Sequence, residues 1–238
     1  MELISWNLRG LNGTHKQDIV RNIIRDQRPN FWLIQETKMK KKTIGKLSFS
    51  SNMNGEATNS NGAAGGVLTL YNKKAYQLST IFNEGNAFLC RVFHIYSNDS
   101  WFLLNIYAPN FKRDRRNFWD KILDTIQKND INKGIIMGDF NTPLLDDKKL
   151  GGMAPNLDNK LDLSNFINSL AFKDMDLLGG RFTWSNRCIG VDCTQVYLDR
   201  VLISPVWLQS SLCRLSLLPR VGSNHSPISL SINPLMVR

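Results

Sequence analysis

The chain has 238 residues, of which 42% are hydrophobic and 21% are charged, a balance that is typical of a folded protein and excludes global disorder. No apolar run approaches the roughly 18 residues that a membrane-spanning helix needs, and the sequence does not open with an apolar signal segment. The length fits one large domain better than two small ones. We therefore expect a single domain over residues 1–238. The protein is expected to be intracellular and monomeric, without membrane contact, and a nuclear location fits this expectation.

The charge is strongly basic and unevenly distributed. Lys and Arg number 30 against 20 Asp and Glu, a net charge of +10, and residues 9–46 alone hold ten basic and three acidic residues, a net +7. Exposed basic side chains attract the phosphates of nucleic acids and release counterions, so DNA is the expected partner. For residues 38–46, which include Lys40 and Lys41, two interpretations stay open: a solvated helix face, or a rim that contacts phosphate.

The cysteines argue against a disulfide scaffold and against zinc. Four of them, at positions 90, 188, 193 and 213, are too few to stabilise a chain of this length by disulfides. Cys188 and Cys193 have the spacing of a metal-binding pair, but neither a His nor a second Cys pair lies near them in the sequence.

The N-terminal part predicts two strands with a helix between them. Strands are expected over residues 1–6 and 31–34. Thr14 with Gln17 predicts a capping box at the start of the helix, and Pro29 stops it. Residues 50–66 are rich in Ser, Asn, Gly and Ala and predict a flexible loop.

The rest of the chain predicts many strands and few helices. The expected strands cover residues 67–71, 77–82, 88–96, 101–107, 134–137, 182–185, 196–203, 215–218 and 228–232. Amphipathic helices are expected over residues 113–129 and around residues 163–170. A doubly wound parallel sheet would need a helix after nearly every strand, so this order favours an α/β fold in which two sheets form a sandwich.

Polar residues recur where these apolar strands end, and two more lie near the C-terminus. They are Asn7, Glu36, Tyr107, Asp139, Asn141, Asp199 and His225. One such residue alone usually serves a turn or a buried hydrogen bond. Because strand ends can meet at one edge of a sandwich, the set taken together predicts a pocket.

Six short motifs carry a resemblance to a known family. They are Ser5-Trp6-Asn7-Leu8-Arg9-Gly10, Gln35-Glu36-Thr37, Asn105-Ile106-Tyr107-Ala108-Pro109-Asn110, Gly138-Asp139-Phe140-Asn141, Leu198-Asp199-Arg200 and Ser223-Asn224-His225-Ser226-Pro227. In this order and spacing they resemble the endonuclease/exonuclease/phosphatase superfamily. The strongest resemblance is to the endonuclease domains of plant LINE-type (non-LTR) retrotransposons, which share the Trp-Asn-x-Arg-Gly start and the segment Phe182-Thr183-Trp184-Ser185.

The resemblance implies a fold and an activity. The fold is the DNase I-like, four-layered α/β sandwich, in which two mixed β-sheets are flanked by helices. The activity is that of a Mg²⁺-dependent DNA endonuclease, with Mn²⁺ as a substitute ion, that leaves a 3′-hydroxyl and a 5′-phosphate. Mg²⁺ suits such a site because it prefers oxygen ligands and takes only one or two protein carboxylates.

The resemblance also implies roles for individual residues. Glu36 is the expected principal metal ligand, with Asn7 and Asn224 on the same side of the pocket. Asp139 is expected to orient or deprotonate the attacking water, and His225, fixed by Asp199, to stabilise the charge on the scissile phosphate. Asn141 and Tyr107 are expected to contact the phosphate. Further contacts to DNA are expected from Arg9 and Thr183 and, on the separate ground of the basic run, from Lys40 and Lys41.

One position departs from the family pattern and keeps two alternatives open. Relatives usually read Ser-Asp-His where this chain has Ser223-Asn224-His225, which removes one negative charge on the metal side of the pocket. A catalytically weakened remnant that still binds nucleic acid is the first alternative. The second is a phosphatase of the same superfamily, against which the Trp-Asn-Leu-Arg-Gly start and the Phe-Thr-Trp-Ser segment argue.

Overall fold

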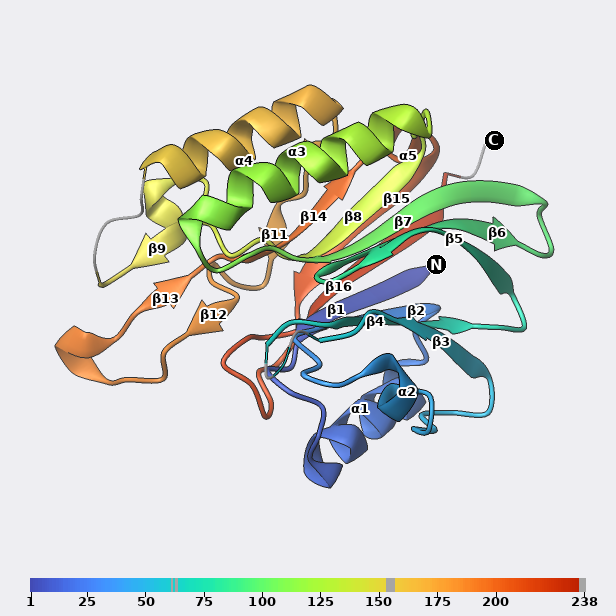
Figure 1. Ribbon diagram of the computed structural model, residues 1–238, viewed down its shortest axis with the longest axis horizontal. Helices are drawn as coiled ribbons and strands as arrows, with labels where there is room; N and C mark the ends of the chain where they lie inside the picture. Colours follow the sequence, from blue (N-terminus) through green and yellow to red (C-terminus); the bar gives the residue numbers. More distant parts are fainter. Residues whose placement is uncertain (61, 63, 153–156, 236–238) are drawn as a thin grey trace.

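The computed structural model describes residues 1–60, 62, 64–152 and 157–235. Within these residues, two large β-sheets face one another (Figure 1). The first has the strand order β11 (Leu177–Leu178), β15 (Ser211–Leu217), β16 (Ile228–Pro234), β1 (Glu2–Asn7), β2 (Phe31–Gln35), β4 (Val67–Asn72) and β3 (Met53–Ala57). The second has the order β10 (Lys173–Asp174), β14 (Asp199–Ile203), β8 (Gly134–Asp139), β7 (Asp99–Tyr107), β6 (Ala87–His94) and β5 (Tyr76–Glu84).

Helices cover the outer faces of the two sheets, as Figure 1 shows. α1 (Thr14–Gln27) and α2 (Lys41–Ile44) lie on the first sheet, and α3 (Lys112–Lys128) and α4 (Leu157–Leu170) lie on the second. The short α5 (Pro205–Ser210) connects β14 to β15. Two 3₁₀ turns, η1 (Asp146–Lys148) and η2 (Gly190–Asp192), accompany a small third sheet of β12 (Trp184–Ser185), β13 (Gln195–Val196) and β9 (Lys149–Leu150). The four-layered α/β sandwich expected from the sequence is thereby confirmed.

No helix in the described part of the chain combines the length and the apolar character that crossing a membrane requires.

Apolar side chains fill the spaces between the four layers, because the central strands bury both of their faces. In β1, Leu3 packs between the two sheets, whereas Ile4 and Trp6 pack in the layer under α1. On the other side, Trp119 of α3 and Phe166 of α4 pack against the second sheet, with their ring centroids 4.7 Å apart. This burial on both faces explains why the central strands read as continuous apolar runs in the sequence.

The strand register brings polar strand ends to one edge of the sandwich. β1 and β2 run parallel with Asn7 opposite Gln35, and β7 and β8 run parallel with Tyr107 opposite Asp139. β14 runs antiparallel to β8, so its first residue, Asp199, also lies opposite Asp139. The carboxyl ends of the central strands of both sheets therefore meet where the polar residues are.

Two local expectations for the N-terminal half are wrong. Gly13, and not Thr14, is the N-cap of α1, without a side-chain cap, and the Gln17 amide donates instead to the Leu11 carbonyl. Within residues 50–66, of which 61 and 63 lie outside the described residues, β3 pairs antiparallel with β4. Asn, Gly and Glu dominate β3, so its propensity is low, and pairing at the sheet edge stabilises it instead.

Two of the late strands differ from the apolar runs that predicted them. The expected strand 182–185 is reduced to β12, and the expected strand 196–203 divides into β13 and β14. The break at residues 197–198 lets Val196 join the small third sheet while Asp199 starts a strand of the second sheet. Asp199 therefore lies at a strand start, and not inside a strand, which places its side chain at the polar edge.

Candidate active site

A cavity of about 230 Å³ lies at this polar edge. It is lined by Asn7, Arg9, Glu36, Tyr107, Asn110, Asp139, Asn141, Trp184, Val196, Leu198 and His225. The structure thus brings together most of the residues that the sequence singled out. Cavities of about 430 and 870 Å³ lie elsewhere, between α1, α2 and β3, but neither is lined by such a group of carboxylates and imidazole.

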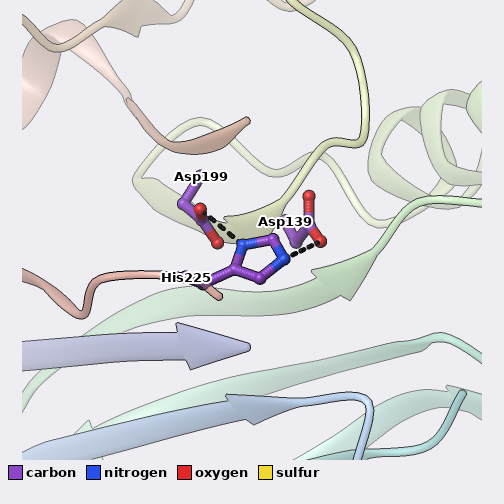
Figure 2. Close-up of side chains that lie close together, drawn as sticks. All are labelled: Asp139, Asp199 and His225. Atoms are coloured by element: carbon purple, nitrogen blue, oxygen red, sulfur yellow. Dashed lines mark hydrogen bonds and ion pairs between the residues drawn. The ribbon is translucent and has the colours of Figure 1, made fainter. Parts of the chain in front are cut away.

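One wall of the cavity is a buried cluster of two carboxylates around an imidazole (Figure 2). His225 Nδ1 lies 2.9 Å from Asp199 Oδ2, and His225 Nε2 lies 3.8 Å from Asp139 Oδ2. The second oxygen of Asp199, Oδ1, is buried without a hydrogen-bond donor among the described residues. The Asp199 carboxylate is therefore compensated mainly by the imidazole, which favours a proton on Nδ1.

The electrostatics of this cluster suit proton chemistry near neutral pH. Burial raises the pKa of Asp139 to about 6; the His225 cation opposes this shift, and the Asp199 charge adds to it. Burial alone would lower the pKa of His225, but the Asp199 and Asp139 carboxylates outweigh it and raise this pKa above its usual value. The arrangement thus favours a charged imidazole beside a carboxyl group that titrates close to neutrality.

Asp139 is held in place by hydrogen bonds from the segment after β8 and from β1. Its Oδ1 accepts from the Asn141 N–H at 2.9 Å, and its Oδ2 accepts from the Asn7 side-chain amide at 2.8 Å. Gly138 has φ +153°, and a Cβ there would lie 2.0 Å from the Ile106 carbonyl oxygen, so only glycine allows this approach of β8 to β7. The Asn141 amide donates to the Ala108 carbonyl, which fixes that side chain at the cavity wall.

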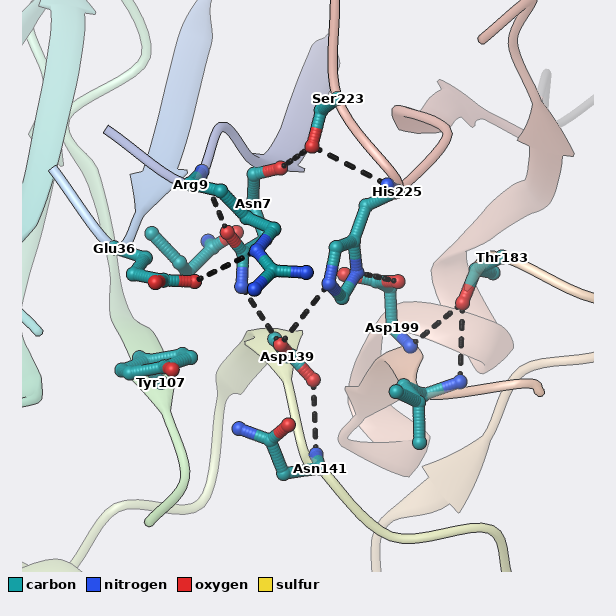
Figure 3. Close-up of polar contacts among 12 residues, drawn as sticks. Asn7, Arg9, Glu36, Tyr107, Asp139, Asn141, Thr183, Asp199, Ser223 and His225 are labelled. Atoms are coloured by element: carbon teal, nitrogen blue, oxygen red, sulfur yellow. Dashed lines mark hydrogen bonds and ion pairs between the residues drawn. The ribbon is translucent and has the colours of Figure 1, made fainter. Parts of the chain in front are cut away.

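The opposite wall carries Glu36 in a different environment. Glu36 follows β2 with φ 54°, in the left-handed region, and its carboxylate faces two cations. Lys38 Nζ lies 3.0 Å from Oε1, and Arg9 Nε lies 4.0 Å from Oε2. The side-chain amide of Asn7 links this wall to Asp139 (Figure 3). Its oxygen Oδ1 accepts from the backbone N–H of Arg9 at 2.9 Å, while its nitrogen donates to Asp139.

Tyr107 enters the cavity as a neutral phenol. Burial raises its pKa to about 12, with additional contributions from the Glu36 and Asp139 charges. Its hydroxyl oxygen accepts from the Asn110 amide at 3.1 Å, which leaves the O–H free to donate. The side chain can therefore donate a hydrogen bond into the cavity at any physiological pH.

Thr183 lies beneath the cavity and not on its surface, which corrects its expected role in substrate contact. The side chain is fully buried, and its hydroxyl oxygen accepts from the N–H groups of Leu198 and Asp199, both at 3.0 Å (Figure 3). Its carbonyl also accepts from the Ser226 N–H at 2.7 Å. Thr183 thus joins the start of β14 to the turn that carries His225.

Three other expected residues lie away from the cavity lining. Asn224 is half-buried; its carbonyl accepts from the Ser185 N–H, and its side chain is not part of the lining. Lys40 and Lys41 lie at the start of α2, and Lys41 forms an ion pair with Glu56. The structure therefore does not bring these residues to the cluster around Asp139.

The structure also adds supporting residues that the sequence did not assign. The Ser223 hydroxyl donates to the Asn7 carbonyl and accepts from the His225 N–H, and the Trp6 indole donates to the His225 carbonyl. Ser223 and Trp6 belong to the six motifs, so the motifs could have identified them. Lys38, two residues after Glu36, had no signal beyond its place in the basic run.

Two donor sets fit different ions. Asp139, Asp199 and His225 offer atoms that all lie within 4.8 Å of one another, and a set that includes imidazole suits transition metals. Glu36 and the Asn7 amide oxygen offer oxygen only, which suits a hard cation such as Mg²⁺. His225 Nδ1 is already engaged by Asp199, and Asn7 Oδ1 accepts from the Arg9 N–H but has a second lone pair that an ion can use.

Solved structures share this fold. AP endonuclease LMAP from Leishmania major superposes with a TM-score of 0.81 at 14% identity, over 98% of this chain and 87% of that chain. The 3′-5′ exonuclease NExo from Neisseria meningitidis gives 0.78 at 14% identity, over 98% and 100%. The endonuclease domain of TRAS1, a telomere-specific non-LTR retrotransposon, gives 0.74 at 12% identity, over 98% of both chains. At these identities the likeness concerns the fold.

The sequence matches a family profile along most of its length. The profile of the Endonuclease/Exonuclease/phosphatase family covers residues 4–225, a span that runs from β1 to His225 and contains both walls of the cavity. The superfamily indicated by the six motifs is thereby confirmed, whereas an origin in plant LINE-type elements stays a prediction. The chain belongs to the endonuclease/exonuclease/phosphatase family.

Proposed function

We propose that the chain is a DNA endonuclease that hydrolyses phosphodiester bonds with the help of a divalent ion, Mg²⁺ or Mn²⁺, and that it derives from a plant LINE-type retrotransposon. The observation that carries the proposal is the meeting of Asp139 and the Asp199–His225 pair with Glu36 across one cavity. The fold shared with an AP endonuclease and with a retrotransposon endonuclease domain supports it.

Asp139 is the proposed proton acceptor for the attacking water. A general base is most effective when its pKa lies near the working pH, and burial brings the pKa of Asp139 to about 6. The hydrogen bonds from Asn7 and Asn141 hold both carboxylate oxygens in place. Water attacks phosphorus as its proton moves to Asp139, the P–O3′ bond breaks, and the departing O3′ takes up a proton from solvent, which leaves a 3′-hydroxyl and a 5′-phosphate.

Hydrolysis also requires that the negative charge on the phosphate be stabilised. The other residues of the cavity would do this. His225, whose cationic form Asp199 stabilises, would donate to a phosphate oxygen through Nε2. Tyr107 would add its phenolic O–H, and Arg9, whose side chain is 45% exposed, a charged guanidinium. Asn141 would also contact the phosphate.

Glu36 and the Asn7 oxygen would hold the divalent ion. When bound, the ion supplies positive charge that neutralises the phosphate oxygens and the developing oxyanion. DNA is the proposed substrate because the net charge of +10, of which residues 9–46 contribute +7, favours a long polyanion over a small neutral molecule.

A nicking assay on supercoiled plasmid tests the proposal, with Mg²⁺, Mn²⁺ and EDTA in parallel reactions. We expect relaxed circles with either ion and none with EDTA, and the nicks should be extendable by a DNA polymerase because they end in a 3′-hydroxyl. Release of inorganic phosphate from a 3′-phosphorylated oligonucleotide without nicking would instead indicate the phosphatase alternative.

Asn224 favours a second candidate, a weakened remnant that binds DNA, because it lacks the carboxylate usual at this position. DNA binding without nicking, in either metal ion, would support this candidate against the first.

A further inference from the structure

Lys38 contributes the nearer of the two cations that face Glu36. Its ammonium lies 3.0 Å from Glu36 Oε1, while Arg9 Nε lies 4.0 Å from Oε2. The Glu36 side chain is 11% exposed and that of Lys38 is 29% exposed, so solvent screens this pair less than a surface ion pair. Each oxygen of the carboxylate therefore already has a positive charge near it.

The backbone holds this pair in an uncommon conformation. Both Glu36 and Lys38 have positive φ, at 54° and 56°, which non-glycine residues seldom adopt and which persists where the surrounding structure enforces it. The Lys38 N–H donates to the Gly65 carbonyl at 3.0 Å, and the Gly10 N–H donates to the Glu36 carbonyl at 2.7 Å. The two residues are thus fixed from both sides, unlike residues of a free surface loop.

The Lys38 stem is also held by its surroundings. Gly10 has φ +109°, and a Cβ there would lie 3.5 Å from Lys38 Cδ, so the aliphatic chain passes directly over this glycine. The stem can swing its terminal ammonium, because Lys has four flexible bonds and its charge is a compact point. Backbone and stem together make the ammonium a built part of the Glu36 environment.

We propose that Lys38 is the resident counter-ion of Glu36, which a divalent ion must displace in order to bind. This inference rests on the proposed function, in which Glu36 holds the ion. An ammonium and a divalent cation at the same carboxylate repel one another across a short, poorly screened distance. The competition therefore lowers the affinity for the ion.

The competition also couples the ion to the substrate. With Arg9 and Lys38 both near Glu36, the wall carries more positive than negative charge before an ion arrives. A phosphate in the cavity adds the missing negative charge. Divalent ions should consequently bind more tightly when DNA is present than when it is absent.

Direct Mn²⁺ titration, followed by the loss of the free-ion signal in electron paramagnetic resonance, tests the proposal without reference to activity. Lys38→Met keeps an unbranched stem and removes the charge. We expect it to bind Mn²⁺ roughly tenfold more tightly than the parent, about 1.4 kcal/mol. Lys38→Gln serves as a second charge-removing variant if the first does not fold, and Lys38→Arg should retain the parental affinity.

Lys74→Met is the matched control, because it removes the same charge at the opposite end of the sheet. It lies just beyond β4, near Tyr71, which pairs with Phe31 at the start of β2, whereas Glu36 follows the end of β2. Its Mn²⁺ affinity should equal that of the parent.

The remaining outcomes separate this inference from the proposed function. Unchanged or weaker Mn²⁺ binding by the folded Lys38→Met and Lys38→Gln proteins, together with lost binding by Glu36→Gln, would overturn the role of Lys38 and leave the ion site in place. Absence of Mn²⁺ binding in the parent and in every Lys38 variant would overturn both.

Discussion

The two walls of the cavity present the same functional group in opposite settings. Asp139, at the end of a strand in the second sheet, is fully buried and accepts hydrogen bonds from the neutral amide of Asn7 and the Asn141 N–H. Glu36, at the end of a strand in the first sheet, faces the cations of Lys38 and Arg9. Desolvation prepares one carboxyl group to exchange a proton, whereas the other already faces two cations at the place where the proposed divalent ion would bind.

The largest expected effect comes from removing the proposed base, Asp139. Asp139→Asn keeps the shape of the side chain but cannot accept a proton, so plasmid nicking should fall by about 10³-fold, within the range that general bases contribute. Asp130→Asn makes the same chemical change at an exposed position after α3 and should nick at the parental rate. Parental activity in a folded Asp139→Asn protein would remove Asp139 from the chemistry.

The pH dependence of kcat/KM should report the titration of the buried Asp139 carboxyl group. The pKa of Asp139 is raised to about 6, and the base must be deprotonated, so kcat/KM should rise with pH up to about 6 and fall roughly tenfold per unit below it. The proposed role of His225 needs its cation, and the Asp199 and Asp139 carboxylates raise its pKa above the usual value, so activity should decline again as pH rises through that raised pKa. A profile that is flat between about pH 5 and 7 would contradict this assignment.

Thr183 tests whether the Asp199–His225 pair needs its support. Thr183→Val removes the acceptor of the Leu198 and Asp199 N–H groups and should lower nicking about tenfold, since an unsatisfied buried donor, here that of Asp199, costs about 1–3 kcal/mol and lets Asp199 shift. NMR titration of His225 should show a lower pKa in this variant. Thr183→Ser keeps the oxygen and should keep both values; a parental His225 pKa in Thr183→Val would limit Thr183 to a role in stability.

The smallest effect is expected at Asn224. Asn224→Asp adds negative charge on the side of the proposed divalent ion, but the side chain is outside the cavity lining, so we expect a gain in nicking of only a few-fold, at limiting Mg²⁺. A Mg²⁺ titration of both proteins measures it. Identical curves would show that the amide has not impaired the site.

Much of the fold and part of the site could be predicted from the sequence, because both depend on local patterns. Strands that bury two faces appear as continuous apolar runs, and strand ends appear as the polar residues that follow them, as at Asn7, Glu36 and Asp139. Parallel register then brings such residues to one edge. The motifs around Asp199 and His225 added what periodicity could not.

The features that were missed depend on contacts between distant segments. β3 is stabilised by pairing with β4 and has little propensity of its own, and the hydroxyl of Thr183 turns inward to the start of β14. The Lys38 ammonium pairs with Glu36 while both residues adopt positive φ, a backbone conformation that no side-chain pattern reveals. These features depend on tertiary hydrogen bonds and on unusual backbone angles, which cannot be inferred from local sequence patterns.

The most direct test of this division between the walls compares Glu36→Gln with Asp139→Asn in two measurements, Mn²⁺ binding and plasmid nicking. We predict that Glu36→Gln loses Mn²⁺ binding and nicking together, whereas Asp139→Asn binds Mn²⁺ like the parent and fails to nick. Loss of Mn²⁺ binding by Asp139→Asn, with binding retained by Glu36→Gln, would contradict the account and place the ion at Asp139, Asp199 and His225 instead.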